Sequence, residues 1–273
     1  MNKCPSFYLQ IADFTIYINF GEAEYSIVMF KIYRDIQSFF KGFIVPPSKR
    51  APDFSILIRE KQQELRIKRA NTTCIGMFRI HMPSKTIYMP NTISVFHFSS
   101  TIREVTAYLL NKTKSGFYFH CSAIHYLDHA HIFTGTNGAG KSTIASLLGS
   151  KCPILSDDAG IIRNINNQYC YFQSPLIEKN KKIKKTSKRY KIGSINFLKK
   201  SANFKLSRID DKTKIVNLIA SQLITNAILG FDHRHFQIVD WLFNFLNRLH
   251  HFNTLYFAKN KRELYNNISS LKT

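Results

Sequence analysis

The clearest indication of the fold is the stretch Ala130-His-Ile-Phe-Thr-Gly-Thr-Asn-Gly-Ala-Gly-Lys-Ser-Thr-Ile-Ala-Ser-Leu-Leu148. Residues 130–134 form an apolar run that is typical of a β-strand. Gly135 to Ser142 match the pattern G-x-x-x-x-G-K-S of a P-loop, and residues 141–148 predict a helix that Gly149 ends. A P-loop needs a strand before it and a helix after it, and the sequence predicts both.

The residue types of this loop suit phosphate binding. Glycines let successive backbone N–H groups converge on phosphate oxygens, and the helix N-terminus adds a partial positive charge. Lys141 is expected to reach the β and γ phosphates, and the Ser142 hydroxyl to bind Mg²⁺. We therefore expect ATP and Mg²⁺ as cofactors. The predicted nucleotide-binding residues are Gly135, Thr136, Asn137, Gly138, Ala139, Gly140, Lys141, Ser142 and Thr143.

Two adjacent carboxylates, Asp157 and Asp158, follow the short apolar run 153–155 soon after the predicted helix. A strand there would return them to the phosphate end of the sheet. In phosphoryl transfer, one carboxylate can hold Mg²⁺ while another accepts the proton of the attacking hydroxyl. Taken alone, such a pair also suits a solvated turn. His120, on the strand predicted over 117–126, is expected to reach the same edge and to share a proton with a carboxylate.

His120, the P-loop and Asp157-Asp158, in this order and spacing, resemble the catalytic domain of HPr kinase/phosphorylase and the wider group of HPr kinase-like proteins. The short interval between P-loop and aspartates is also similar to ATP-dependent phosphoenolpyruvate carboxykinase. Segments 172–176, 194–198 and 249–257 are similar to lasso-peptide kinases. The chain has no counterpart of the Leu-Glu-x-Arg-Gly-Leu-Gly signature of HPr kinase, which puts phosphorolysis and HPr as the substrate in doubt.

The resemblance implies an α/β fold with an HPr kinase/phosphoenolpyruvate carboxykinase-like P-loop core and a mixed sheet. It also implies roles for the site residues. Lys141 and the loop amides would bind the ATP phosphates, Ser142 and Asp158 would bind the metal, and Asp157 would be the catalytic base, assisted by His120. The assignment within the aspartate pair stays open. Because HPr kinase is oligomeric, a homo-oligomer is a candidate state.

Residues 1–115 are expected to form a smaller accessory α+β domain, and residues 116–273 the catalytic domain. The first part has no repeat and no chemical motif. It alternates short runs of strand type with helical pieces, and the expected strands include 54–58, 74–81, 86–89 and 94–98, followed by a helix over 102–110. In the second part, Asp210 or Asp211 is expected to cap a helix over 216–229 that Gly230 ends.

The chain is strongly basic, with 39 Lys and Arg against 17 Asp and Glu and a net charge of +22. Such a charge attracts nucleic acid, anionic lipid or an acidic protein, although an AT-rich genome produces the same bias without a function. Residues 179–191 contain eight Lys or Arg. This run would steer an acidic substrate or neutralise transferring phosphate; a solvated loop is the alternative.

The cysteines, the N-terminus and the uncharged stretches of the chain indicate its cellular location. The five cysteines are scattered and form no C-x-x-C pair, so we expect neither disulfides nor a zinc site, as in a reducing cytoplasm. The N-terminus has no sustained apolar region of an export signal. The longest uncharged stretch, 215–231, is too short and too polar to cross a bilayer, so we expect no membrane partner.

The sequence thus predicts an ATP-dependent kinase that transfers the γ-phosphoryl group to a Ser or Thr hydroxyl of a peptide or small protein. One alternative is a kinase for a small hydroxyl compound such as free serine. Another is a nucleotide-dependent protein on nucleic acid. We do not expect nucleic acid as a partner, because the chain has no helix-turn-helix, zinc or RNA-recognition signature. Binding to nucleic acid would also leave the aspartate pair without a role.

Overall fold

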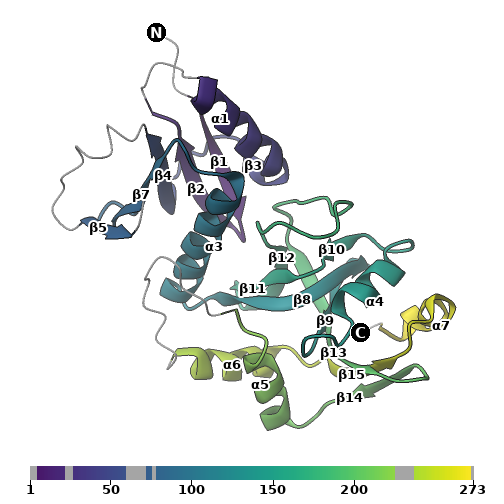
Figure 1. The fold of residues 1–273 in the computed structure, drawn as a ribbon. Coiled ribbons are helices and arrows are strands. Elements are labelled where there is room, and N and C mark those ends of the chain that lie inside the picture. The colour runs from purple at the N-terminus through teal and green to yellow at the C-terminus, as the bar shows by residue number, and fades with distance from the viewer. Residues whose placement is uncertain (1–4, 22–26, 60–71, 76–77, 225–236, 272–273) are drawn as a thin grey trace.

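The structure is a computed structural model that describes residues 5–21, 27–59, 72–75, 78–224 and 237–271 (Figure 1). It is a mixed α/β protein with two mixed sheets, one of seven strands and one of eight. Within these ranges, no helix combines the length and the apolar character that a membrane crossing requires.

The first sheet belongs to the N-terminal part and has the strand order β3-β1-β2-β4-β7-β6-β5. Its central strands β2, β4 and β7 are parallel, and the remaining neighbours pair antiparallel. Strict alternation of buried and half-buried side chains marks β2 and β4, as expected for strands with one covered face. The strands are β1 (Ser6–Ile11), β2 (Phe14–Asn19), β3 (Ile44–Val45), β4 (Phe54–Arg59), β5 (Thr72–Ile75), β6 (Phe78–His81) and β7 (Thr86–Pro90).

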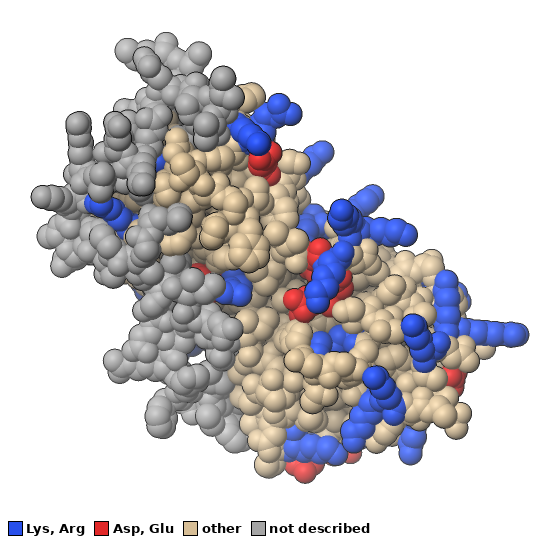
Figure 2. Space-filling view, in the orientation of Figure 1, with Lys and Arg blue, Asp and Glu red and all other residues tan. Residues whose placement is uncertain are grey.

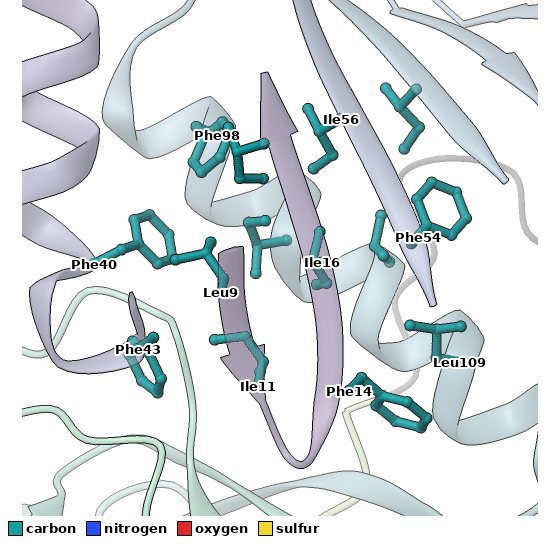
Figure 3. Packing of buried hydrophobic residues seen from close by; sticks show 14 of the residues in the cluster. Leu9, Ile11, Phe14, Ile16, Phe40, Phe43, Phe54, Ile56, Phe98 and Leu109 are labelled. Carbon is teal, nitrogen blue, oxygen red and sulfur yellow. The ribbon is translucent and has the colours of Figure 1, made fainter. Parts of the chain in front are cut away.

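The core of this part lies between the sheet and its helices. Leu9 and Ile16 from the sheet pack with Phe40 and with Phe98 of the long helix α3, and the Phe40 and Phe98 rings meet edge to face at 5.3 Å (Figure 3). The helices are α1 (Ile27–Phe39), the 3-10 turn η1 (Lys41–Phe43) and α3 (Val95–Lys112).

Two of the predicted strands differ from the structure. Residues 94–98 are the N-cap and first turn of α3, where Ser94 Oγ accepts a hydrogen bond from the His97 N–H at 3.3 Å. A run of five residues was too short to separate a strand from a helix, and Ser94 was the signal for a helix cap. The strand predicted over 74–81 is divided between β5 and β6.

The second sheet follows the order β10-β8-β11-β12-β13-β15-β14, and β9 pairs with both β8 and β13. Helices α5 and α6 share one apolar cluster with it, and α4 and α7 share another. The strands are β8 (Gly116–Tyr126), β9 (His129–Thr134), β10 (Ile154–Ser156), β11 (Ala159–Ile165), β12 (Gln168–Gln173), β13 (Tyr190–Lys200), β14 (Lys205–Arg208) and β15 (Phe252–Phe257). The helices are α4 (Lys141–Leu148), α5 (Lys212–Ala220), α6 (Gln237–Arg248), α7 (Lys261–Asn267) and the 3-10 turn η2 (Ile268–Leu271).

The helix predicted over 216–229 begins and ends earlier. Asp211 caps α5, its carboxylate accepting from the Lys214 N–H at 3.1 Å, and the helix ends at Ala220. The predicted stop at Gly230 lies outside the described residues.

Strand direction positions the site. Both β9 and β10 run antiparallel to β8, so they point the same way. The chain segments that follow these two strands therefore leave the sheet at the same edge.

The two sheets share one apolar core, and helix α3 packs on β8. One apolar cluster contains residues of the first sheet together with Tyr118, Ile161 and Phe172 of the second. The Arg163 guanidinium lies over the Phe14 ring, 3.6 Å from its centroid. The predicted domain boundary at 115/116 falls between α3 and β8, and the core continues across it.

Candidate active site

The P-loop connects β9 to α4 with a backbone that needs its glycines. Gly135, Gly138 and Gly140 have φ angles of 147°, 78° and 101°, a region that L side chains rarely adopt. Gly140 is also the N-cap of α4, and a Cβ there would lie 2.8 Å from the Phe257 ring. The loop therefore requires glycine for two reasons: backbone conformation and a close aromatic neighbour.

Lys141 folds back over the loop. Its Nζ donates to the carbonyl oxygens of Gly135 at 2.7 Å and Thr136 at 3.3 Å. Burial lowers the pKa of Lys141, and the nearby Asp158 carboxylate opposes that shift. The loop thus holds an ammonium group at the place where phosphate oxygens would meet the backbone amides.

The rest of the predicted nucleotide-binding residues line the same turn. Residues 136–138 at its tip are exposed, as is Ser142, while Ala139 and Thr143 are half-buried. The Ala139 N–H donates to the Thr136 carbonyl at 3.1 Å and closes the turn. Ser142 Oγ donates to the backbone carbonyl of Asp157 at 3.0 Å, so the first turn of α4 is joined to the end of β10.

His120 and Asp158 form a half-exposed pair beside the loop. The His120 Nε2 lies 3.3 Å from the Asp158 Oδ1, and the two side chains are 33% and 50% exposed. Burial and the positive charge of Lys141 lower the pKa of His120, whereas Asp158 raises it. The histidine is therefore mainly neutral at pH 7 and can accept a proton.

The expected assistance of Asp157 by His120 differs from this geometry, because His120 contacts Asp158. The two aspartates follow β10 directly, and successive side chains of an extended segment point to opposite sides. The neighbour that reaches His120 is therefore the second aspartate of the pair.

Asp157 points the other way and is 5% exposed. Its Oδ2 accepts from the Asn180 N–H at 2.7 Å, and its own N–H donates to Glu178 Oε2 at 3.0 Å. Burial would raise the pKa of Asp157, but hydrogen bonds from Glu178 and from the backbone of Asn180 and Lys179 lower it overall. The Oδ1 atom is buried without a hydrogen-bond partner among the described residues.

The sequence did not predict a role for Glu178, and it included Lys185 in the basic run 179–191 without a role of its own. Both side chains are largely buried, 5% and 13% exposed, and they form an ion pair. Lys185 also donates to the Ser174 carbonyl at 2.7 Å. Burial and the Asp157 carboxyl raise the pKa of Glu178 to about 7, while burial lowers that of Lys185. The available signal was that Glu178 is the one acidic residue among residues 174–191.

Other lysines of this segment are exposed, as they would be in a solvated loop: Lys181, Lys182, Lys184 and Lys188. In the space-filling view, acidic side chains gather near the middle of the face shown, and Lys and Arg side chains project around them (Figure 2).

The donors at this edge suit Mg²⁺. Among the described residues, no group of three or more His, Cys, Asp or Glu side chains could hold a metal ion unaided. A magnesium ion that accompanies a nucleotide keeps several waters and needs only one or two carboxylates besides the phosphates. The Ser142 hydroxyl and the unpartnered Asp157 Oδ1 are oxygen donors of that kind.

We compared the sequence with protein families and with curated proteins. No protein-family model matches the chain, and no curated protein matches it significantly.

Proposed function

We propose that this chain is an ATP-dependent kinase that transfers the γ-phosphoryl group to a Ser or Thr hydroxyl of a peptide or small protein. One observation carries the proposal: a complete P-loop, a histidine–carboxylate pair and a buried carboxylate occupy one edge of the second sheet. A proton acceptor beside a phosphate loop suits transfer of the γ-phosphoryl group to a hydroxyl, whose proton it can take.

The P-loop would bind ATP through the amides of residues 135–143. Lys141 would exchange its bonds to the Gly135 and Thr136 carbonyls for phosphate oxygens, since an ammonium on a flexible stem moves at little cost. Charge on the transferred group would then be stabilised by a donor that the fold already holds in place.

Exposure separates the roles of the two aspartates. Asp158 is half-exposed and paired with His120, so we assign this pair to the acceptor hydroxyl, whose proton it would take. The hydroxyl oxygen then bonds to the γ-phosphorus, and ADP leaves. Ser142 and Asp157 would hold Mg²⁺, which supplies charge neutralisation when bound. This assignment exchanges the roles that the resemblance implied for Asp157 and Asp158.

The finer fold is part of the same proposal. An HPr kinase/phosphoenolpyruvate carboxykinase-like core is supported by the succession β8, β9, P-loop, α4 and β10, with both strands before the functional residues pointing to one edge. The short path from P-loop to aspartates, a single helix and strand, distinguishes it from P-loop ATPases with a distant acidic strand.

An acidic peptide is the acceptor class that the surroundings favour. The histidine–aspartate pair is open to solvent, and the neighbouring loop exposes Lys181, Lys182 and Lys184. Positive charge beside an open site raises the association rate of an anionic partner. We place this reaction in the cytoplasm.

The experiment mixes the protein with Mg·ATP and either free serine or serine peptides with acidic or neutral flanks. We expect ADP release to accelerate with acidic peptides. Acceleration by free serine alone would move the substrate to the small-molecule class. Salt-dependent binding of DNA or RNA without transfer to any acceptor would replace the kinase by a nucleic-acid-binding protein.

A further inference from the structure

The loop 174–189 between β12 and β13 is irregular, yet side chains from both halves of the molecule hold it. Figure 1 places it on the side of the second sheet that faces the N-terminal part. We propose that Glu178 and Lys185 are positioning residues that fix Asp157, and that the N-terminal part holds this pair in place through the loop. The inference rests on the proposed function and names how that site is ordered.

Asp157 is held from the loop through both its backbone and its carboxylate. Glu178 Oε2 accepts from the Asp157 N–H at 3.0 Å, and the Asn180 N–H reaches the Asp157 Oδ2 at 2.7 Å. Lys185 binds the other oxygen of Glu178 and the Ser174 carbonyl. Lys185 therefore joins the beginning of the loop to the carboxylate that contacts Asp157.

Gln173, the last residue of β12, fixes the far side of the loop. Its side-chain amide donates to the Leu155 carbonyl at 2.7 Å and the Lys184 carbonyl at 3.1 Å. Its oxygen accepts from the Thr186 N–H at 2.8 Å. Gln173 is 1% exposed, and its amide connects the loop to β10, the strand that precedes the aspartates.

Described residues of the N-terminal part, in β-turn 11–14, η1 and α3, contact the same loop. The Gly42 carbonyl accepts from the Ser187 N–H at 3.0 Å, and a Cβ on Gly42 would overlap the backbone carbonyl of Lys185. Ser99 of α3 donates to the Pro175 carbonyl at 2.8 Å, and this bond is buried. At the exposed end of the loop, Arg189 pairs with Asp13 at 2.7 Å.

Gly42 contacts the backbone of Lys185 itself. A small displacement of η1 would therefore move the Lys185 ammonium group that is paired with Glu178. The loop transmits such a displacement since its bonds form a continuous series from η1 to Asp157. The described residues of the N-terminal part thus act on the phosphoryl site through the loop.

The test compares Lys185→Met with Lys184→Met. Both substitutions remove one positive charge from the same loop, but only Lys185 is buried and bonded to Glu178; Lys184 uses its backbone carbonyl alone, which methionine keeps. ATP binding is measured by calorimetry with and without Mg²⁺. We expect Lys185→Met to weaken Mg·ATP binding about tenfold and to leave Mg-free binding unchanged, while Lys184→Met changes neither.

Equal effects of the two variants would overturn the inference, because charge steering alone would then explain them. If the wild type binds Mg·ATP and neither variant weakens it, the inference is also wrong while the proposed function stands. If the wild type binds no nucleotide, both fail together.

A double-mutant cycle tests whether the pair acts through Asp157. Glu178→Gln is expected to weaken Mg·ATP binding about tenfold in the wild type and to have no further effect once Asp157→Asn is present. An equal loss in both backgrounds would make Glu178 a structural residue only.

Two further variants keep the test decisive if Lys185→Met does not fold. Glu178→Gln with Lys185→Gln leaves no unpaired buried charge, and the same loss of the Mg²⁺-dependent affinity is expected. Gly42→Ala acts from the N-terminal part and should also weaken Mg·ATP binding more than Mg-free ATP binding; unchanged binding in folded Gly42→Ala would exclude the N-terminal part from this role.

Discussion

The P-loop and the loop 174–189 both serve the edge where the aspartates lie, but they are held in opposite ways. The P-loop is ordered by its own residues: glycines at positive φ, the Ala139 to Thr136 turn and the Lys141 bond to Gly135. The loop 174–189 contains no glycine and is held by Gln173, Asp157 and the N-terminal part. A loop ordered locally carries a sequence pattern, whereas one ordered by distant partners does not.

We expect the largest effect on the transfer rate from a substitution in the P-loop. Lys141→Ala should lower the rate of phosphoryl transfer about a thousandfold, because the developing charge loses a donor already in place. Steady-state ADP release measures it. The exposed Lys200→Ala is the control for loss of one charge. Transfer within a few fold of the wild type would remove Lys141 from the reaction.

The two aspartates differ in their partners, since Asp158 pairs with His120 and Asp157 is bonded both to Ser142 of the P-loop helix and to loop 174–189. Asp158→Asn should slow transfer about a hundredfold with Mg·ATP affinity kept, as expected for loss of a proton acceptor. Asp157→Asn should instead raise the Mg²⁺ concentration needed for binding. Measuring rate and Mg²⁺ titration on both variants checks this; the reverse pattern would restore the roles that the family resemblance implied.

His131 lies on β9, the strand that precedes the P-loop, and tests how that strand is stabilised. It is 2% exposed, bonded to Ser194 at 3.0 Å, and burial lowers its pKa to about 4 against 6.5. Its neighbours His125 and His129 lower that pKa further. The unfolded chain therefore binds more protons between these pH values, and the free energy of unfolding falls as pH drops through them.

From this single group, the loss between pH 6.5 and pH 4 amounts to about 3 kcal/mol. His131→Gln should remove that part of the acid sensitivity, which urea unfolding at several pH values measures. An equally steep fall in the variant would assign the sensitivity to other groups.

We expect the smallest effects from substitutions of two P-loop glycines, measured as losses in the free energy of unfolding. Gly138→Ala should cost about 1 kcal/mol of the free energy of unfolding, since its φ of 78° is unfavourable but no atom lies within 4 Å of an added Cβ. Gly140→Ala should cost about 2–3 kcal/mol because its Cβ also meets Phe257. Equal losses in urea unfolding would show that Phe257 moves aside freely.

The sequence predicted those features whose signals are local. Helix α4 has the predicted bounds, and β8 and β9 begin one residue from them, because hydrophobic runs and glycines mark their ends. The true partner of His120 depends on which way each aspartate points after β10. The burial of Lys185 depends on Glu178 and Gly42, which are far apart in sequence, so a run of basic residues concealed it.

Whether this edge of the sheet is a phosphoryl-transfer site is tested by calorimetric binding of ATP to the wild type and to Lys141→Ala, with and without Mg²⁺. We expect the wild type to bind ATP, Mg²⁺ to strengthen the binding, and Lys141→Ala to weaken it while the protein stays folded. Absence of ATP binding by the wild type, or binding that neither Mg²⁺ nor Lys141 affects, would contradict a phosphoryl-transfer site at this edge.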